Sequence, residues 1–354
     1  MEPVTHFLTG AVLARTGINR RAAYATAAMA IAAYFPDIDV IPGYLFGPVY
    51  GFQHHRGITH TFLAIPFEAA FIVLCFYLGY RIRGRPQRKA PHNWVWLYGG
   101  VLLALLSHLL LDWTNNYGIR PFYPFNDRWY AGSFVFIFEP VMFLLLLGAL
   151  ILPSLFALIN SEVGARKKPF QGRGWAIAAL IGIAALYIVR FNQHAAAIQI
   201  ARINAPADAT RIFASPYPIN PFRWAAVADS PASYQLLTVD TRTGLAEPPI
   251  PADTLYKPAD TPALEAAKQT RLGRVYLDWS SWPVLSESPD NTDPHHPLTR
   301  ITFSDARFMY DTILFHGSPD AGSAPPLSGT VLLDMAAAPS QQLVETTMNG
   351  KIQR

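Results

Sequence analysis

Four apolar segments dominate the first 191 residues, and they restrict this chain to a small set of folds. They run over Phe62–Tyr80, Trp94–Leu111 and Phe134–Ile159, with a shorter one at Trp175–Phe191. A hydrocarbon core of about 30 Å takes about 20 apolar residues to cross. In lipid only helices and closed barrels satisfy their own backbone groups, so these segments predict a helical membrane bundle.

Two shorter segments precede them, Pro3–Arg15 and Ala22–Phe35. The second carries no charge but is too short to span alone, so it is either a partial span or a helix packed within the bundle. Hydrophobic residues make up 51% of the chain and charged residues 15%, which also favours lipid contact. Glu2 and the lack of a basic leader predict that the first residues belong to the mature fold.

Basic residues indicate the orientation, because Lys and Arg next to membrane helices stay on the cytoplasmic side. The basic positions are Arg15, Arg20 and Arg21, then Arg81, Arg83, Arg85, Arg88 and Lys89, and finally Arg166, Lys167, Lys168 and Arg173. All three groups fit one side of a multi-pass protein of the plasma (inner) membrane. The segments 36–61 and 113–133, and everything after residue 191, are then predicted to face outward. This explains the net charge of +4 better than nucleic-acid binding does, and we expect no nucleic-acid partner.

After residue 191 the pattern changes to short alternating segments separated by Pro, Gly and Asp turns, which is typical of strands. Predicted strands lie at Tyr234–Val239, Arg274–Trp279, Thr299–Phe303 and Thr330–Leu333. The predicted fold is therefore an α-helical multi-pass membrane bundle, residues 1–191, followed by an extracytoplasmic, β-rich (α+β) domain, residues 192–354. That domain shows no catalytic set, and His295 and His296 are expected to be solvated.

Four clusters in the membrane half carry candidate metal ligands. They are His6; Asp37 and Asp39; His55 and His60, in the run HHRGITH; and His108 and Asp112. A four-residue spacing puts His108 and Asp112 on one face of a helix. With the basic loops inside, all four clusters are predicted to meet at the outer end of the bundle.

These ligands favour a divalent metal, because carboxylates near an apolar layer are costly unless compensated. Mixed His and Asp ligation suits zinc first, with manganese or iron as alternatives, and Cys75 is the only cysteine, so thiolate ligation is excluded. Each piece also has a structural explanation: His6 as a hydrogen-bonded core residue, Asp37 and Asp39 as a turn and N-cap pair, and His108 with Asp112 as an interhelical pair.

The chain resembles the YdjM-like family of membrane-bound metal-dependent hydrolases over roughly residues 1–160. The resemblance rests on Thr5-His6, Pro36-Asp37-Ile38-Asp39, His55 to Thr61, His108 to Gly118, and Glu139-Pro140. It implies that metal-binding or catalytic roles fall to His6, Asp37, Asp39, His55, His60, His108 and Asp112. Thr61, Asn115-Asn116 and Glu139 depart from the usual pattern, and the family's description names no substrate.

The predicted function is metal-dependent hydrolysis of an ester or phosphoester, with a lipid-like substrate at the outer membrane face. Asp39, Arg56 and Asp112 are the predicted catalytic residues: a carboxylate as proton acceptor, and Arg56 as an anion clamp. Two alternatives remain open. Glu68, Glu139 and the ligand cluster would form the ion path of a divalent-metal transporter. A non-catalytic membrane protein would use the metal to join its short helices.

Overall fold

The computed structural model describes the chain except residues 86, 163–169, 291–296, 313–316, 318–324 and 354. The chain forms two compact units. The helical unit comprises Met1–Ile38 and Arg56–Phe191, and the β-rich unit comprises Asp39–His55 and Asn192–Arg354. Each unit has its own core.

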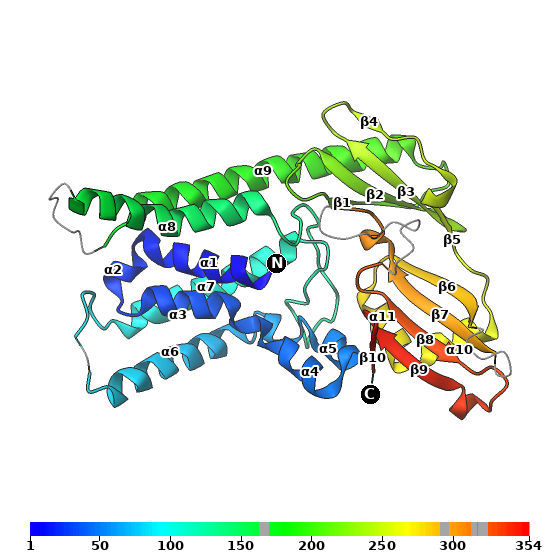
Figure 1. The fold of residues 1–354 in the computed structure, drawn as a ribbon, viewed down its shortest axis with the longest axis horizontal. Coiled ribbons are helices and arrows are strands. Elements are labelled where there is room, and N and C mark those ends of the chain that lie inside the picture. The colour runs from blue at the N-terminus through cyan, green and yellow to red at the C-terminus, as the bar shows by residue number, and fades with distance from the viewer. Residues whose placement is uncertain (86, 163–169, 291–296, 313–316, 318–324, 354) are drawn as a thin grey trace. The chain divides into compact units, whose positions relative to one another are not determined.

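Helices of the first unit lie side by side (Figure 1). Their bounds are α1 Pro3–Leu13, the π-helical turn Ala14–Ile18, α2 Asn19–Arg21, α3 Ala25–Tyr34, α6 Ile65–Ile82, α7 Trp94–Thr114, α8 Pro140–Glu162 and α9 Arg173–Asn204, with 3₁₀ turns at Phe35–Val40 and Ile58–His60. Small and aliphatic side chains of α3, α6 and α7 fill the core, including Ala28, Ala32, Ala69 and Ala104, all fully buried. Small residues allow the close backbone approach typical of membrane helices.

Four of these helices, α6 to α9, are long and apolar enough to cross a membrane. The predicted start of the third span at Phe134 is wrong: α8 begins at Pro140. Phe134 and Val135 instead donate backbone hydrogen bonds to the carbonyl of Thr114, at 3.0 and 3.1 Å. Proline fits the first turn of a helix because it lacks the N–H that goes unused there. The fourth span is longer than predicted, since α9 has 32 residues.

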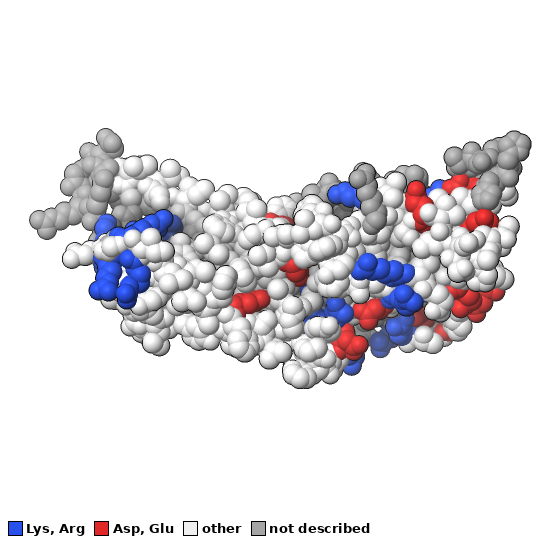
Figure 2. All heavy atoms as spheres, turned by 90° about the horizontal axis from the view of Figure 1, so that it is seen from below, with Lys and Arg blue, Asp and Glu red and all other residues white. Residues whose placement is uncertain are grey.

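Lys and Arg side chains gather at one end of the helical unit, where α2 and the loop between α6 and α7 lie (Figure 2). Between that end and the opposite one the visible surface is largely uncharged, as expected of a surface in contact with lipid. Arg166, Lys167 and Lys168 lie outside the described residues.

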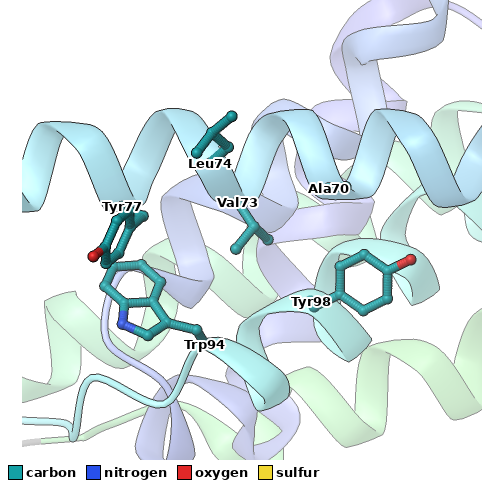
Figure 3. A pocket seen from close by; sticks show the side chains of 6 residues that line it. All are labelled: Ala70, Val73, Leu74, Tyr77, Trp94 and Tyr98. Atoms are coloured by element: carbon teal, nitrogen blue, oxygen red, sulfur yellow. The ribbon is translucent and has the colours of Figure 1, made fainter.

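An open groove of about 430 Å³ lies between α6 and α7 (Figure 3). Its lining comes from Ala70, Val73, Leu74, Tyr77, Trp94 and Tyr98. Tyr77 and Trp94 pack edge to face at one end of it, with ring centroids 5.3 Å apart. None of these side chains is a carboxylate or an imidazole, so the groove suits hydrocarbon and not a metal ion.

The β-rich unit contains two antiparallel sheets. One has the order β1-β2-β3-β4, with β5 also on β3, and the other has the order β10-β9-β8-β7-β6. Strand bounds are β1 Arg211–Pro216, β2 Arg223–Asp229, β3 Ser233–Asp240, β4 Leu245–Ala246, β5 Thr254–Tyr256, β6 Pro283–Asp290, β7 Leu298–Asp305, β8 Gly329–Leu333, β9 Leu343–Met348 and β10 Lys351–Ile352. The described part of this unit also contains the C-terminal end of α9 and the helices α4 Ile41–Phe46, α5 Pro48–His54, α10 Pro262–Gln269 and α11 Arg271–Trp279.

Three of the four predicted strands are confirmed, as parts of β3, β7 and β8. The fourth, Arg274–Trp279, is wrong, because these residues belong to helix α11. Leu272, Tyr276 and Trp279 are buried, and this spacing of four and three residues marks one face of a helix. The Thr270 side chain accepts a hydrogen bond from the backbone N–H of Gly273 and so caps the first turn.

The crossing of α1 and α3 gives a stability prediction. A Cβ on Gly10 would lie 2.1 Å from the Met29 carbonyl oxygen, whereas a Cβ on Gly99 of α7 meets no described atom within 4 Å. We expect Gly10→Ala to lower the free energy of unfolding by about 1–3 kcal/mol through overpacking. We expect Gly99→Ala to leave it unchanged or raise it by about 0.5–1 kcal/mol. Thermal unfolding in detergent measures both; equal effects would contradict the close α1–α3 contact.

Candidate metal centre

The helical unit brings four of the predicted ligands together, all near the ends of helices. They are Asp37, in the 3₁₀ turn after α3; His60, in the turn before α6; and His108 and Asp112, near the end of α7. One potential ligand atom of each lies within 4.8 Å of the others, and all four residues are buried. Since the chain enters α7 from the basic loop, the cluster lies at the opposite end of that helix from its start at Trp94.

The distances within this cluster are similar to those between the ligand atoms of a metal ion. The Nε2 atoms of His60 and His108 are 3.0 Å apart, and they lie 3.4 and 3.7 Å from Asp37 Oδ1. The same two nitrogens lie 3.5 and 3.6 Å from Asp112 Oδ2. In a tetrahedral site with metal–ligand bonds of about 2.0–2.2 Å, neighbouring ligand atoms lie about 3.3–3.6 Å from each other. The four donors are therefore close enough together that they could hold one metal ion.

Both ligand atoms on α7 are oriented by further contacts. His108 Nδ1 lies 2.7 Å from the Ala33 carbonyl oxygen, which can only accept, so Nδ1 carries the proton and the lone pair of Nε2 faces the cluster. The two carboxylate oxygens of Asp112 differ in their hydrogen-bond partners. Oδ1 accepts hydrogen bonds from the Met1 amino group and from Arg56, while Oδ2 is buried and has no hydrogen-bond partner in the described chain. A buried carboxylate oxygen without a donor is what a bound cation would satisfy.

Arg56 holds Asp112 in place. Its Nη2 lies 3.0 Å from Asp112 Oδ1, and its Nη1 donates to the Asp112 carbonyl, Asn115 Oδ1 and the Gly118 carbonyl at 3.3, 3.2 and 2.8 Å. The guanidinium also lies over the Tyr117 ring, 4.6 Å from its centroid. Arg56 is only 3% exposed and has a left-handed backbone, with φ of 55°. These contacts define a positioning residue; that Arg56 clamps a substrate anion stays a prediction.

His6 lies beside the cluster. Its Nε2 is 3.2 Å from Asp112 Oδ1, and its ring stacks on that of His108 with centroids 3.9 Å apart. Sequence reasoning found His6 but missed three groups that support the ligands: the Met1 amino group, the Ala33 carbonyl and the Asn115 side chain. The contacts of a backbone group cannot be inferred from the residue type that carries it. Asn115 is noted in the sequence only because it departs from the family pattern.

The pKa of the Asp37 carboxyl is lowered in this environment. Burial raises the pKa of its carboxyl, but the hydrogen bond from His60 and the nearby imidazoles outweigh burial and hold the pKa well below its usual range.

Asp39 and His55 belong to the β-rich unit and pair with each other, His55 Nδ1 lying 3.0 Å from Asp39 Oδ1. Their predicted roles, as metal ligands and with Asp39 as a catalytic residue, stay predictions. His295 and His296 lie outside the described residues.

Elemental analysis of protein purified without chelator tests the four-residue cluster. We expect His60→Ala and Asp112→Ala to lose most of the bound divalent metal, since each removes one of four donors. The matched control is His54→Ala, which removes an exposed imidazole close to His60 in sequence and should keep the wild-type metal content. Metal retained in both cluster variants would contradict the site.

Comparison with known proteins identifies the family of this chain. The family model of the YdjM inner membrane protein matches residues 1–197, more than half of the chain. The uncharacterized protein YfhP of Bacillus subtilis (strain 168) is 34% identical over 115 residues, which is 32% of this chain and 32% of the length of YfhP. No solved structure matches. Together with the four candidate spans, the family match makes this an inner membrane protein. The chain belongs to the YdjM inner membrane protein family.

Proposed function

We propose that this protein is a membrane-bound metal-dependent hydrolase that acts on an ester or phosphoester. The observation that carries the proposal is the cluster of two imidazole and two carboxylate donors at Asp37, His60, His108 and Asp112. A metal held there would supply water of lowered pKa and polarise the bond to be cleaved. Nitrogen and oxygen donors at these spacings favour zinc, with manganese or iron as alternatives, over calcium, which prefers oxygen ligands alone.

The chain's own residues prepare this site before a substrate arrives. The bond from His108 to the Ala33 carbonyl fixes the tautomer that leaves Nε2 unprotonated. Arg56 fixes the rotamer of Asp112 and partly neutralises it, while leaving Oδ2 to face the two imidazoles. Both supports are buried, Ala33 completely and Arg56 to within 3%.

The substrate class follows from the surroundings. The cluster belongs to a unit with four membrane-length helices, so a substrate reaching it from lipid would have an apolar part. We therefore propose a lipid-like ester or phosphoester. Membrane lipid is the expected partner, and we expect no nucleic-acid partner.

One observation favours a second function, a structural metal that joins helices. Structural zinc sites have four protein ligands and no open position, and three of the four donors here are fully buried, with Asp37 6% exposed. The transporter hypothesis has no comparable support. It counts Glu139 as an intramembrane acid on an ion path, but Glu139 forms an ion pair with the buried Arg190, which compensates its charge.

Activity distinguishes hydrolase from structural metal protein. The full chain in lipid nanodiscs, loaded with zinc or manganese, should hydrolyse a phospholipid or a generic phosphoester, and chelation should abolish turnover reversibly. Arg56→Met should lower activity or metal affinity about 10–100-fold, the usual cost of losing a residue that orients a ligand. Arg56→Lys should be milder because it keeps a cation beside Asp112.

Two outcomes count against hydrolysis. Metal-loaded wild type that cleaves none of the tested esters would remove the enzyme proposal. Chelation that unfolds the protein, without any activity to lose, would establish the structural role.

We further propose that the cluster and the β-rich unit face the outside of the cytoplasm. The support is the positive-inside rule applied to Arg81, Arg83 and Arg85, which are exposed in the last turn of α6 and in the loop after it. Alkaline phosphatase fused after the last residue should be active, and the same reporter fused at Gly84 should be inactive. The reverse pattern would contradict this orientation.

A further inference from the structure

The segment Asp39–His55 forms a tight helical hairpin of α4 and α5, which we call the α4–α5 hairpin. Gly43 and Gly51 allow the two helices to touch, because a Cβ on either would lie 2.8–2.9 Å from the Cα of the other. No charged residue occurs between Asp39 and His54. Such a segment is a compact apolar element and not an ordinary surface loop.

One side of this hairpin is firmly attached to the β-rich unit. Phe52 of α5 packs on Tyr276 and Trp279 of α11, with ring centroids 5.8 and 5.0 Å apart. The Arg271 guanidinium donates to Gln53 Oε1 at 2.8 Å. The Gln353 side chain bridges the turn, accepting from Val49 N–H at 2.9 Å and donating to the Phe46 carbonyl at 3.0 Å. The hairpin is therefore held in one conformation.

Its other side, α4, presents large apolar side chains to the surroundings. Tyr44, Leu45 and Phe46 are 83%, 71% and 59% exposed, and Ile41 is 49% exposed. Three consecutive exposed residues of this kind are costly in water. Their aromatic and aliphatic mixture is the one enriched where proteins meet the bilayer interface.

The hairpin's place in the chain identifies what covers it. Both of its ends continue directly into the helical unit, at Ile38 and at Arg56, and that unit carries the four candidate membrane spans. Its C-terminal end leads through the turn Ile58–His60 into α6, one of the candidate spans, and its N-terminal end follows α3, which shares a core with the candidate span α7. A segment this short, held at both ends by that bundle, stays close to the bilayer surface. We propose that the α4–α5 hairpin inserts Tyr44, Leu45 and Phe46 into the interface of the lipid bilayer and thereby anchors the β-rich unit to the membrane.

Site-specific fluorescence in lipid nanodiscs tests this proposal. In a Cys75→Ser background, an environment-sensitive fluorophore is attached through Leu45→Cys, or through Leu245→Cys as the control. Leu245, in β4 of the same unit, is 66% exposed and so closely matched to Leu45. The probe at position 45 should shift its emission to the blue and be quenched several-fold more strongly by spin-labelled phospholipid than by aqueous iodide. The probe at position 245 should show the opposite preference.

Three results would overturn the proposal. The probe at position 45 could respond to iodide as the control does, which would leave α4 in water. It could shift to the blue without quenching by the labelled lipid, which would indicate a protein partner such as a second copy. Equal lipid quenching at both positions would mean that contact is not specific to the hairpin. Unchanged thermal unfolding of both labelled variants confirms that each is folded.

Discussion

The compensation of buried negative charge is the constraint on which the helical unit depends. Asp37 and Asp112 are almost completely buried among apolar helices, where an isolated carboxylate is strongly unfavourable. Arg56, the Met1 amino group and His6 contact one oxygen of Asp112, and the imidazoles of His60 and His108 face the other. The turns that follow α3 and precede α6 are thereby tied to the end of α7. Packing of the alanine-rich α3 against α7 then follows from small side chains that let the backbones approach.

Much of this arrangement could be predicted from the sequence because its signals are local. Membrane-length helices come from uninterrupted apolar runs, and the facing of His108 and Asp112 comes from their spacing on one helix. The predictions were wrong where one sequence pattern is compatible with two different backbone conformations. Phe134–Phe138 is as apolar as the helix that follows it, yet it is an irregular segment with bends, and α8 begins only at Pro140. Arg274–Trp279 alternates like a strand, but the spacing of its buried residues is helical.

Other features could not be predicted because their partners are distant in the chain. The segment Asp39–His55 reads as a loop between two membrane helices, but it packs against residues about 220 positions later, as the contact between Gln53 and Arg271 shows, with a separation of 218 residues. Arg56 likewise reads as a free cation within HHRGITH, although three of its acceptors are backbone or amide oxygens between Asp112 and Gly118. Residue types alone do not indicate such acceptors.

The hydrogen bond from His108 to the Ala33 carbonyl has a consequence for how the helices move. Ala33 lies in the last turn of α3, where carbonyl groups lack a donor further along the helix. The proton on His108 Nδ1 therefore satisfies a carbonyl at the end of α3, and the same hydrogen bond affects the basicity of the His108 imidazole on α7. Any rotation of α3 that broke this bond would also change the electron-donating strength of His108 toward a bound cation. The ligand strength of His108 is in this way coupled to the position of a helix that contributes none of the four clustered side chains.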